Sequence, residues 1–310
     1  MKKKKRNNPY GDLLWMDGRF VRTESASVPV LSHSLHYGSA AFEGIRAYET
    51  DRGAAVFRLK DHVDRLFHSA RTLGMRLPFS RAEIARAIKG IVRKNKLSSC
   101  YIRPIAYFKE SMGLVPAKDT AVCVAIAAWE WGRYLKKDAV SVAFSPYVRI
   151  HPHSTDTTAK IAGHYVNSTL ASARAKKEGA DEALLLDYRG YVAEGPGENI
   201  FFVKGRTLYT PKEGAILPGI TRKTIMELAR DKGMRVAEKD IAPKDIPSFS
   251  EAFFTGTAAE VNAIGRIGNT VFSGGKEGEV TRMLREAYAD CVRGNIAKYR
   301  KWCDFVQPSL

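Results

Sequence analysis

Three segments in the second half of the 310-residue chain carry residue types that could act together in catalysis. Lys160 lies in a stretch of small and apolar residues (TTAKIAG), where burial would disfavour the charged amine and allow it to form a Schiff base. Glu194 follows an apolar strand and opens a bend rich in glycine and proline (EGPGEN), which could hold its carboxylate rigidly towards a cleft. Taken singly, a solvated lysine and a turn-forming acid are the commoner explanations of these two residues.

The third feature is a pair of glycine-containing junctions that could bind an anion. The Leu217–Arg222 segment (LPGITR) is predicted to open a helix, and the Thr255–Glu260 segment (TGTAAE) follows a predicted strand. Unpaired backbone N–H groups and the positive end of a helix dipole make such junctions phosphate sites, although either could be an ordinary cap. A Schiff-base lysine, a carboxylate beside a pyridine nitrogen and a phosphate cradle are together what pyridoxal 5'-phosphate requires.

The composition is that of an ordinary soluble globular protein and excludes several other classes. With 45% hydrophobic and 27% charged residues, the chain is neither disordered nor collagen-like. No apolar run approaches the ~20 residues of a membrane helix, and the MKKKKR head lacks the apolar region of a signal peptide. The four cysteines are scattered without a C-x-x-C pair, which argues against a disulfide framework or cysteine zinc site and favours the cytoplasm.

The net charge of +17 raises the question of an anionic partner. Five of the positive charges lie in the first six residues, and we expect residues 1–12 to form a basic, disordered tail, with a phosphate-binding arm as the alternative. In the body of the chain, basic residues alternate with acidic ones, as in Lys60–Arg71. Such alternation is typical of a solvated helix face, so we do not expect nucleic acid as a partner.

Hydrophobic periodicity and turn residues predict an α+β fold in two halves. The first half is predicted to contain a hairpin over Leu13–Val21 turning at Asp17-Gly18, a strand over Ala54–Leu59, a helix around Val63–Leu73 ended by Gly74, a helix from Ser80 to about Lys96 with Glu83 completing a capping box, and strands over Cys100–Phe108 and Thr120–Trp129. The second half is predicted to contain strands over Val140–Tyr147, Arg235–Glu238, Ala252–Thr255 and Val261–Phe272, a meander over Ala183–Asp187, Gly190–Ala193, Asn199–Lys204 and Thr207–Thr210, and helices over His164–Lys177, Thr221–Lys232 and Gly278–Val292. We expect a small N-terminal domain over 13–130, a linker over 131–139 and a larger C-terminal domain over 140–310.

Six strings, in order along the chain, resemble the class IV, fold-type-IV aminotransferases, and within them the branched-chain amino acid aminotransferases. They are His36–Arg46 (HYGSAAFEGIR), Tyr101–Pro104 (YIRP), Lys160–Tyr165 (KIAGHY), Tyr191–Ile200 (YVAEGPGENI), Leu217–Arg222 and Thr255–Glu260. The resemblance runs from about Leu13 to the C-terminus. It implies pyridoxal 5'-phosphate held between a smaller N-terminal α/β domain and a larger C-terminal domain of mixed β structure with helices. It also implies ping-pong transamination of leucine, isoleucine and valine with 2-oxoglutarate in amino-acid biosynthesis.

The resemblance also implies roles for individual residues. Lys160 would form the Schiff base and shuttle the proton, Tyr165 would hydrogen-bond the phenolic oxygen of the cofactor, and Glu194 would pair with its pyridinium nitrogen. The other residues implied in cofactor binding are Arg65, Asn199, Leu217, Ile220, Thr221 and Thr257. The residues implied in substrate binding are Tyr37, Phe42, Gly44, Tyr101, Arg103, Trp131, Tyr134, Thr257, Ala258 and Ala259.

Two of these arginines also have plainer explanations. Arg65 lies on the polar side of its predicted helix, where arginines mostly face solvent, and Arg103 alternates with Tyr101 on a strand, where an edge salt bridge is common. In the family, Arg103 would hold the distal carboxylate of glutamate or 2-oxoglutarate, because a guanidinium can bind a carboxylate bidentately. The family is at least dimeric, with Tyr37 and the Met112–Leu114 segment contributing to the partner's site.

Several alternatives compete with this hypothesis. D-amino acid aminotransferase, (R)-selective amine transaminase and aminodeoxychorismate lyase share the fold, but the FEGIR string and the Tyr101-x-Arg103 pair resemble the branched-chain group. A basic nucleic-acid-binding protein would need a binding motif that the sequence lacks. A non-catalytic relative is disfavoured because Lys160, Tyr165 and Glu194 are all present.

Two histidine groupings raise the possibility of a metal site. His33 and His36 are spaced H-x-x-H, and His151 and His153 precede Asp156. Neither group is a complete ligand set, so we predict no metal. The second group lies in 150–158, where the chain departs most from the family.

Overall fold

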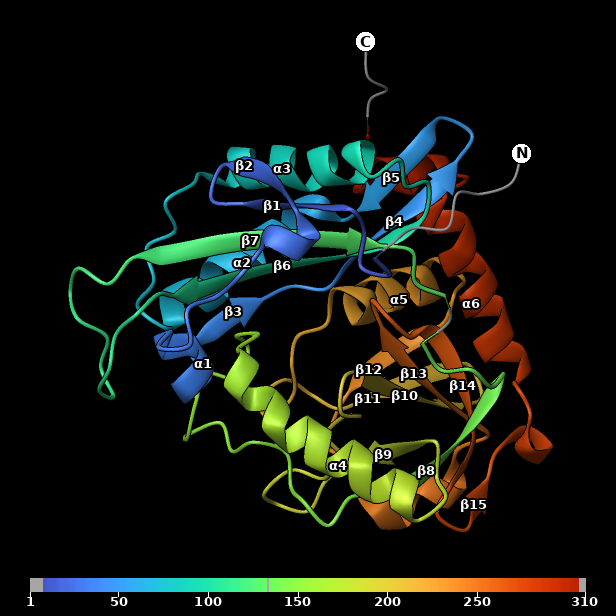
Figure 1. The fold of residues 1–310 in the computed structure, drawn as a ribbon. Helices are drawn as coiled ribbons and strands as arrows, with labels where there is room; N and C mark the ends of the chain where they lie inside the picture. The colour runs from blue at the N-terminus through green and yellow to red at the C-terminus, as the bar shows by residue number, and fades with distance from the viewer. Residues whose placement is uncertain (1–7, 133, 307–310) are drawn as a thin grey trace. The chain divides into compact units, whose positions relative to one another are not determined.

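The computed structural model describes residues 8–132 and 134–306, which form two compact units (Figure 1). Unit 1 contains the described part of Met1–Gly132 together with Ala159–Gly163 and the described residues from Cys291 onwards, and unit 2 contains the described part of Arg133–Thr158 and His164–Asp290. Residues 1–7 of the predicted basic tail lie outside the described part. The predicted boundary at 131–139 lies near the change of unit, whereas Ala159–Gly163 and the C-terminal segment contact unit 1. The division into domains over 13–130 and 140–310 stays a prediction.

Unit 1 is built on an antiparallel sheet. Its strands are β1 (Leu13–Met16), β2 (Arg19–Arg22), β3 (Ala40–Phe42), β4 (Ile45–Thr50), β5 (Gly53–Phe57), β6 (Cys100–Phe108), β7 (Val122–Trp129) and β16 (Cys303–Phe305). The order is β16-β5-β4-β6-β7-β1-β2, and β3 pairs with β6. The predicted hairpin is confirmed, since Asp17 and Gly18 both adopt the positive φ of a two-residue turn between β1 and β2.

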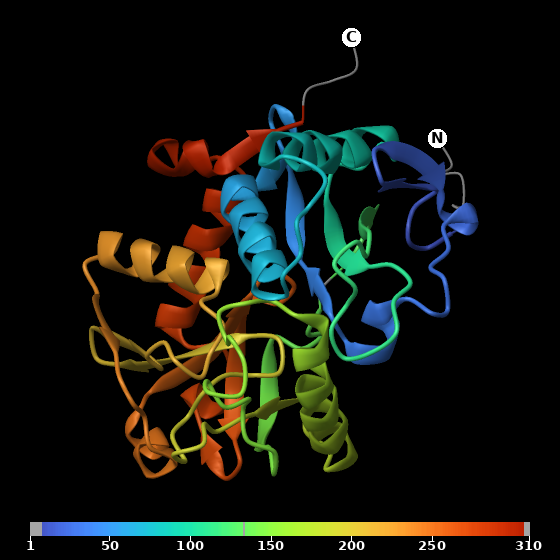
Figure 2. The ribbon, with the colours of Figure 1, turned by 90° about the vertical axis from the view of Figure 1, so that its left-hand side faces the viewer.

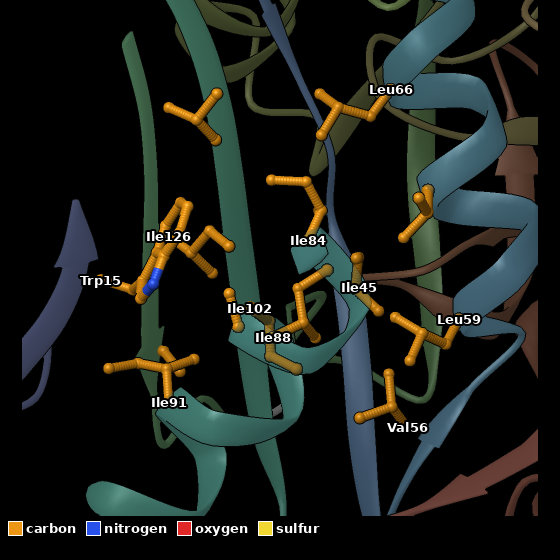
Figure 3. Close-up of a cluster of buried hydrophobic side chains, with 14 of the residues drawn as sticks. Trp15, Ile45, Val56, Leu59, Leu66, Ile84, Ile88, Ile91, Ile102 and Ile126 are labelled. Carbon is orange, nitrogen blue, oxygen red and sulfur yellow. The ribbon is translucent and has the colours of Figure 1, made fainter. Parts of the chain in front are cut away.

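Two helices of unit 1 pack on its sheet around a hydrophobic core. The helices of this unit are α1 (His33–Tyr37), α2 (Leu59–Thr72) and α3 (Arg81–Lys94). Figure 3 shows Leu59 and Leu66 of α2 and Ile88 of α3 facing Ile45 and Ile102 of the strands. The predicted end of α2 is confirmed within one residue, but the helix begins at Leu59, in the stretch predicted as the end of a strand. The predicted start of α3 is confirmed, because Ser80 and Glu83 form the capping box at its first turn.

Unit 2 contains a mixed sheet. Its strands are β8 (Ala139–Phe144), β9 (Glu182–Leu184), β10 (Asn199–Lys204), β11 (Thr207–Thr210), β12 (Arg235–Glu238), β13 (Glu251–Gly256), β14 (Glu260–Ile267) and β15 (Thr270–Val271), in the order β12-β11-β10-β13-β14-β8-β9 with β15 beside β14. The pairs β11–β12, β14–β8 and β8–β9 are parallel, and the others are antiparallel. Phe202, Phe249 and Phe254 pack in its core.

Helices cover different parts of this second sheet. The helix α4 (Tyr165–Lys177) packs against β8 and β9, and α5 (Ile220–Asp231) packs against β12 and β13 (Figures 1 and 2). The helix α6 (Glu279–Val292) belongs to unit 2 up to Asp290, and its last residues, from Cys291, belong to unit 1. Short 3-10 turns occupy Thr23–Ser25, Ala162–His164, Pro243–Ser248, Ser273–Gly275 and Ala297–Trp302. No helix among the described residues has the length and apolar character needed to span a membrane.

Part of the predicted meander is wrong. The strand β9 pairs in parallel with β8, and the stretch predicted as a strand at Gly190–Ala193 forms only an isolated bridge between Leu186 and Val192. The physical reason is the buried Asp187 side chain, which accepts hydrogen bonds from the backbone N–H groups of Arg189 and Tyr191. These bonds close a tight turn and leave the segment free to lead into Glu194 as a loop.

Candidate active site

The Lys160 backbone is held from two sides within unit 1. The Phe42 N–H donates to the Lys160 carbonyl (3.1 Å), and the Lys160 N–H donates to Oγ of the fully buried Ser69 (2.8 Å). A bridge pairs Ile161 with Ala41, so the segment continues the edge of β3. The side chain of Lys160 is half-buried, and Nζ lies 4.8 Å from the centre of the Phe42 ring. An amine on such a fixed backbone is positioned for chemistry.

Unit 1 also brings together several of the residues predicted to bind substrate. Arg103 on β6 donates from Nη2 to the Tyr101 hydroxyl (3.0 Å), and its guanidinium lies 4.8 Å from the centre of the Phe42 ring. The Trp131 ring packs edge-on against Tyr101, with centroids 4.5 Å apart. Nε of Arg103 is buried without a hydrogen-bond partner among the described residues, as expected of a group that would pair with a ligand.

Gly44 leaves the space that the Tyr101 hydroxyl occupies. A Cβ built on Gly44 would overlap that oxygen, at a separation closer than real atoms approach. No side chain therefore fits at this position of the FEGIR string while Tyr101 keeps its place. The family resemblance implies Gly44 in substrate binding, and the close approach of Tyr101 is the steric reason for a glycine there.

Arg65 pairs with a buried carboxylate that the sequence analysis missed. Nε of Arg65 lies 2.5 Å from Oε1 of Glu43 and Nη2 lies 3.0 Å from Oε2, while Nδ1 of His62 donates to Oε2 at 2.7 Å. Burial by itself raises the pKa of Glu43. The charge of Arg65 and the contact with His62 lower the pKa by more than burial raises it, so the net result is a pKa of about 2. Burial lowers the pKa of His62 despite its acidic partner. Glu43 is therefore an anion paired with a cation.

The Glu194 carboxylate lies in a hydrogen-bond network of unit 2. It is buried and accepts from Nε of Arg149 (2.7 Å), from Nδ2 of Asn199 (2.9 Å) and from the backbone N–H of Leu217 (3.2 Å). Asn199 also donates to the Leu217 carbonyl. The structure thus brings together three predicted cofactor residues and adds Arg149, which no motif in the sequence indicated.

Of the two predicted anion-binding junctions, one is the N-terminus of a helix and the other is a turn between two strands. Gly219 is the N-cap of α5, and Ile220 and Thr221 form its first turn, where backbone N–H groups have no helical partner. A Cβ on Gly219 would overlap Oδ1 of Asn199, so this junction is built against the Glu194 network. Thr257, Ala258 and Ala259 form the half-buried turn between β13 and β14.

The remaining predicted site residues lie at other places in the two units. Tyr165 is the half-buried first residue of α4, Tyr37 is exposed at the end of α1, and Tyr134 is exposed near the start of unit 2. His33 uses both ring nitrogens within unit 1, on Ser39 and on the Gly113 carbonyl. No cluster of three or more histidine, cysteine and acidic side chains suited to a metal occurs in the described residues.

Residues 40–267 match the sequence family described as amino-transferase class IV. The chain belongs to that family. It is 45% identical over 300 residues to a branched-chain-amino-acid aminotransferase of Pseudomonas aeruginosa, covering 95% of this chain and 97% of the relative. It is 36% identical over 301 residues to the enzyme of that name from Escherichia coli K12, covering 95% and 97%.

A solved structure with the same name superposes closely. The branched-chain amino acid aminotransferase of T.th., complexed with N-(5'-phosphopyridoxyl)-L-glutamate, is 43% identical, with a TM-score of 0.93 over 97% of this chain and 100% of its own. The resemblance and the fold class predicted from the sequence are confirmed.

Replacing Gly44 with alanine tests the close approach of Tyr101. We expect Gly44→Ala to lower the free energy of unfolding by about 1–3 kcal/mol, because the Tyr101 hydroxyl must move and leave its bond to Arg103. Denaturant unfolding measures this. Gly132→Ala is the matched control, since a Cβ there meets nothing within 4 Å, and equal stability of the two variants would contradict the packing described.

Proposed function

We propose that this protein is a pyridoxal-phosphate-dependent aminotransferase that moves the amino group of leucine, isoleucine or valine to 2-oxoglutarate. The observation that carries the proposal is Lys160, an amine on a backbone fixed by Phe42 and Ser69 in a chain that belongs to the class IV aminotransferases. The names of the relatives and the bound groups in the solved structures support the same reaction.

The residues present fit pyridoxal phosphate. In unit 2, Thr255 carries a buried hydroxyl with no hydrogen-bond partner among the described residues, two positions before Thr257. The first turn of α5 supplies backbone N–H groups suited to a phosphate. Glu194 is a buried carboxylate suited to a pyridinium nitrogen. When bound, the cofactor would supply an electron-accepting ring that stabilises negative charge at the substrate Cα.

Each residue of the chain would then have a defined task. Lys160 would bind the cofactor covalently and, once released by substrate, take the Cα proton on Nζ and deliver it to the cofactor carbon that carries the amino group. Glu194 would keep the ring nitrogen protonated, and Tyr165 would donate to the phenolic oxygen. Leu217 would pack on the ring. The phosphate would be held by Arg65, Ile220, Thr221 and Thr257.

The substrate would bind through two kinds of group. Backbone N–H groups of the Thr257–Ala259 turn, with the Tyr101 hydroxyl, would hold the α-carboxylate. The aromatic rings proposed to surround the apolar side chain are Tyr37, Phe42, Trp131 and Tyr134. Arg103, whose Nε lacks a partner among the described residues, would bind the distal carboxylate of glutamate or 2-oxoglutarate.

We also propose that the enzyme is a homodimer or a higher homo-oligomer. Unit 1 exposes large apolar side chains, with Leu114 84%, Val115 82% and Val30 71% accessible. Exposure of this extent is costly in water and typical of a surface that a second copy covers. Tyr37 and the Met112–Leu114 segment would contribute to the partner's site. The four cysteines are buried free thiols, which supports a cytoplasmic location.

Replacing Lys160 tests the reaction directly. We expect Lys160→Ala to lower kcat by about 10³-fold or more, because proton transfer at the substrate Cα loses its base, while pyridoxal phosphate still binds without a covalent bond. Steady-state transamination and cofactor retention on gel filtration measure the two effects. Lys177→Ala, an exposed change on α4, is the control. Undiminished turnover by Lys160→Ala would exclude the proposed role.

Replacing Arg103 tests the recognition of two substrate types. We expect Arg103→Ala to reduce kcat/KM for glutamate by about 10- to 100-fold, since a charge-assisted hydrogen bond to the distal carboxylate is lost. Leucine has no distal carboxylate and should be affected much less. Half-reaction kinetics with each amino acid measure the ratio, and an equal loss for both would show that Arg103 does not discriminate.

A further inference from the structure

Glu43 is a buried, charged residue of the FEGIR string to which the proposed function assigns no task. Its side chain is fully buried, at 0% accessibility, and carries a negative charge. A buried carboxylate is costly unless charged and hydrogen-bonding groups surround it. The surrounding groups are Arg65, His62 and the backbone N–H of Gly44, which donates to Oε2 at 3.2 Å.

The contact with Arg65 uses one edge of the guanidinium. Nε and Nη2 donate to the two carboxylate oxygens in the parallel arrangement of a bidentate pair. A side-on pair of this kind fixes both the position and the plane of the guanidinium. The position of Glu43 therefore determines the orientation of the Arg65 guanidinium.

The same two elements that hold Lys160 also hold this pair. Glu43 directly follows Phe42, whose N–H binds the Lys160 carbonyl, and Arg65 lies four residues before Ser69, whose hydroxyl binds the Lys160 N–H. Residues four apart lie on one face of a helix. Arg65 therefore lies on the same face of α2 as Ser69, whose hydroxyl binds the Lys160 backbone.

We propose that Glu43 is a positioning residue for the cofactor phosphate, holding the guanidinium of Arg65 in the orientation that binds a phosphate monoester. This inference rests on the proposed function, which assigns the phosphate to Arg65. A long, flexible arginine loses much conformational freedom when it binds a ligand, and a fixed partner removes that loss in advance. His62 holds the second carboxylate oxygen and so fixes Glu43 in turn.

Glu43 also has an effect that opposes phosphate binding. Its negative charge offsets the positive charge of Arg65 and so weakens the attraction of the site for an anion. The proposal therefore predicts that orientation outweighs charge. If charge dominated, neutralising Glu43 would tighten phosphate binding.

The test compares two ligands that differ only in the phosphate. Apoenzyme is titrated with pyridoxal 5'-phosphate and with pyridoxal, and the dissociation constants are measured from the change in absorbance. We expect Glu43→Gln to weaken binding of pyridoxal 5'-phosphate by about tenfold and to leave pyridoxal binding unchanged. In an Arg65→Gln background, Glu43→Gln should have no further effect, because it acts through the arginine.

Controls separate positioning from general damage. Glu182→Gln removes another buried carboxylate, one that is bonded to Ser172, and should leave the preference for the phosphorylated ligand unchanged. Thermal unfolding of the apoprotein verifies folding. If Glu43→Gln does not fold, Glu43→Asp replaces it, since the shorter acid keeps the charge but shifts the carboxylate, and it should lower the preference in the same direction.

The possible outcomes distinguish the inference from the function on which it rests. Equal weakening of both ligands, or unchanged or tighter binding of pyridoxal 5'-phosphate by a folded Glu43 variant, would overturn the positioning role. If wild-type protein binds neither ligand, the proposed function itself fails. If it binds both equally well, the phosphate role of Arg65 fails.

Discussion

The anchoring of the Lys160 backbone is the interaction on which the rest of the account depends. One hydrogen bond from Phe42 and one to Ser69 hold this residue between β3 and α2, although it is separated from both by about a hundred residues of chain. Ser69 is fully buried in the helix that packs on the sheet. The lysine position is therefore as rigid as the hydrophobic core beneath it.

Glu43 in unit 1 and Glu194 in unit 2 are both buried among hydrogen-bond donors, and the two arrangements differ in a way that suits different tasks. Glu43 meets a bidentate arginine and a histidine, so its oxygens are committed to organising neighbouring groups. Glu194 meets one arginine nitrogen, one amide and one backbone N–H. In both places burial of a charged group lowers the stability of the fold. Such groups are common at functional sites, where the geometry of the side chains matters more than stability.

The sequence predicted the regular elements well where the signal was local. The capping box at Ser80, the Asp17-Gly18 turn and the periodicity of α2 each depend on residues within one turn or one helix. The short strands β3 and β16 escaped prediction, because they are fixed by pairing with partners distant in the sequence. The strand β4 was also missed, although it forms a hairpin with the neighbouring β5. The strand prediction at Gly190–Ala193 was wrong for a different, local reason, because hydrogen bonds to the side chain of Asp187 decide the conformation there.

The candidate site was predicted mainly through resemblance, and its supporting contacts were not. Lys160, Glu194 and the α5 junction stood out by residue type and context. Arg149 lies 45 positions before Glu194, and Glu43 lies 22 positions before Arg65. No spacing rule in a single sequence relates residues so far apart. The steric need for glycine at positions 44 and 219 likewise depends on side chains brought close only by the fold.

The most direct test of the central claim is the visible absorption spectrum of the purified protein loaded with pyridoxal phosphate, before and after addition of L-leucine without any oxo acid. The account predicts a visible band that disappears as the amino group passes to the cofactor, and that returns when 2-oxoglutarate is added. A band that only a D-amino acid or a simple amine removes would contradict the proposed substrate. The absence of any band after loading would contradict the assignment of Lys160 itself.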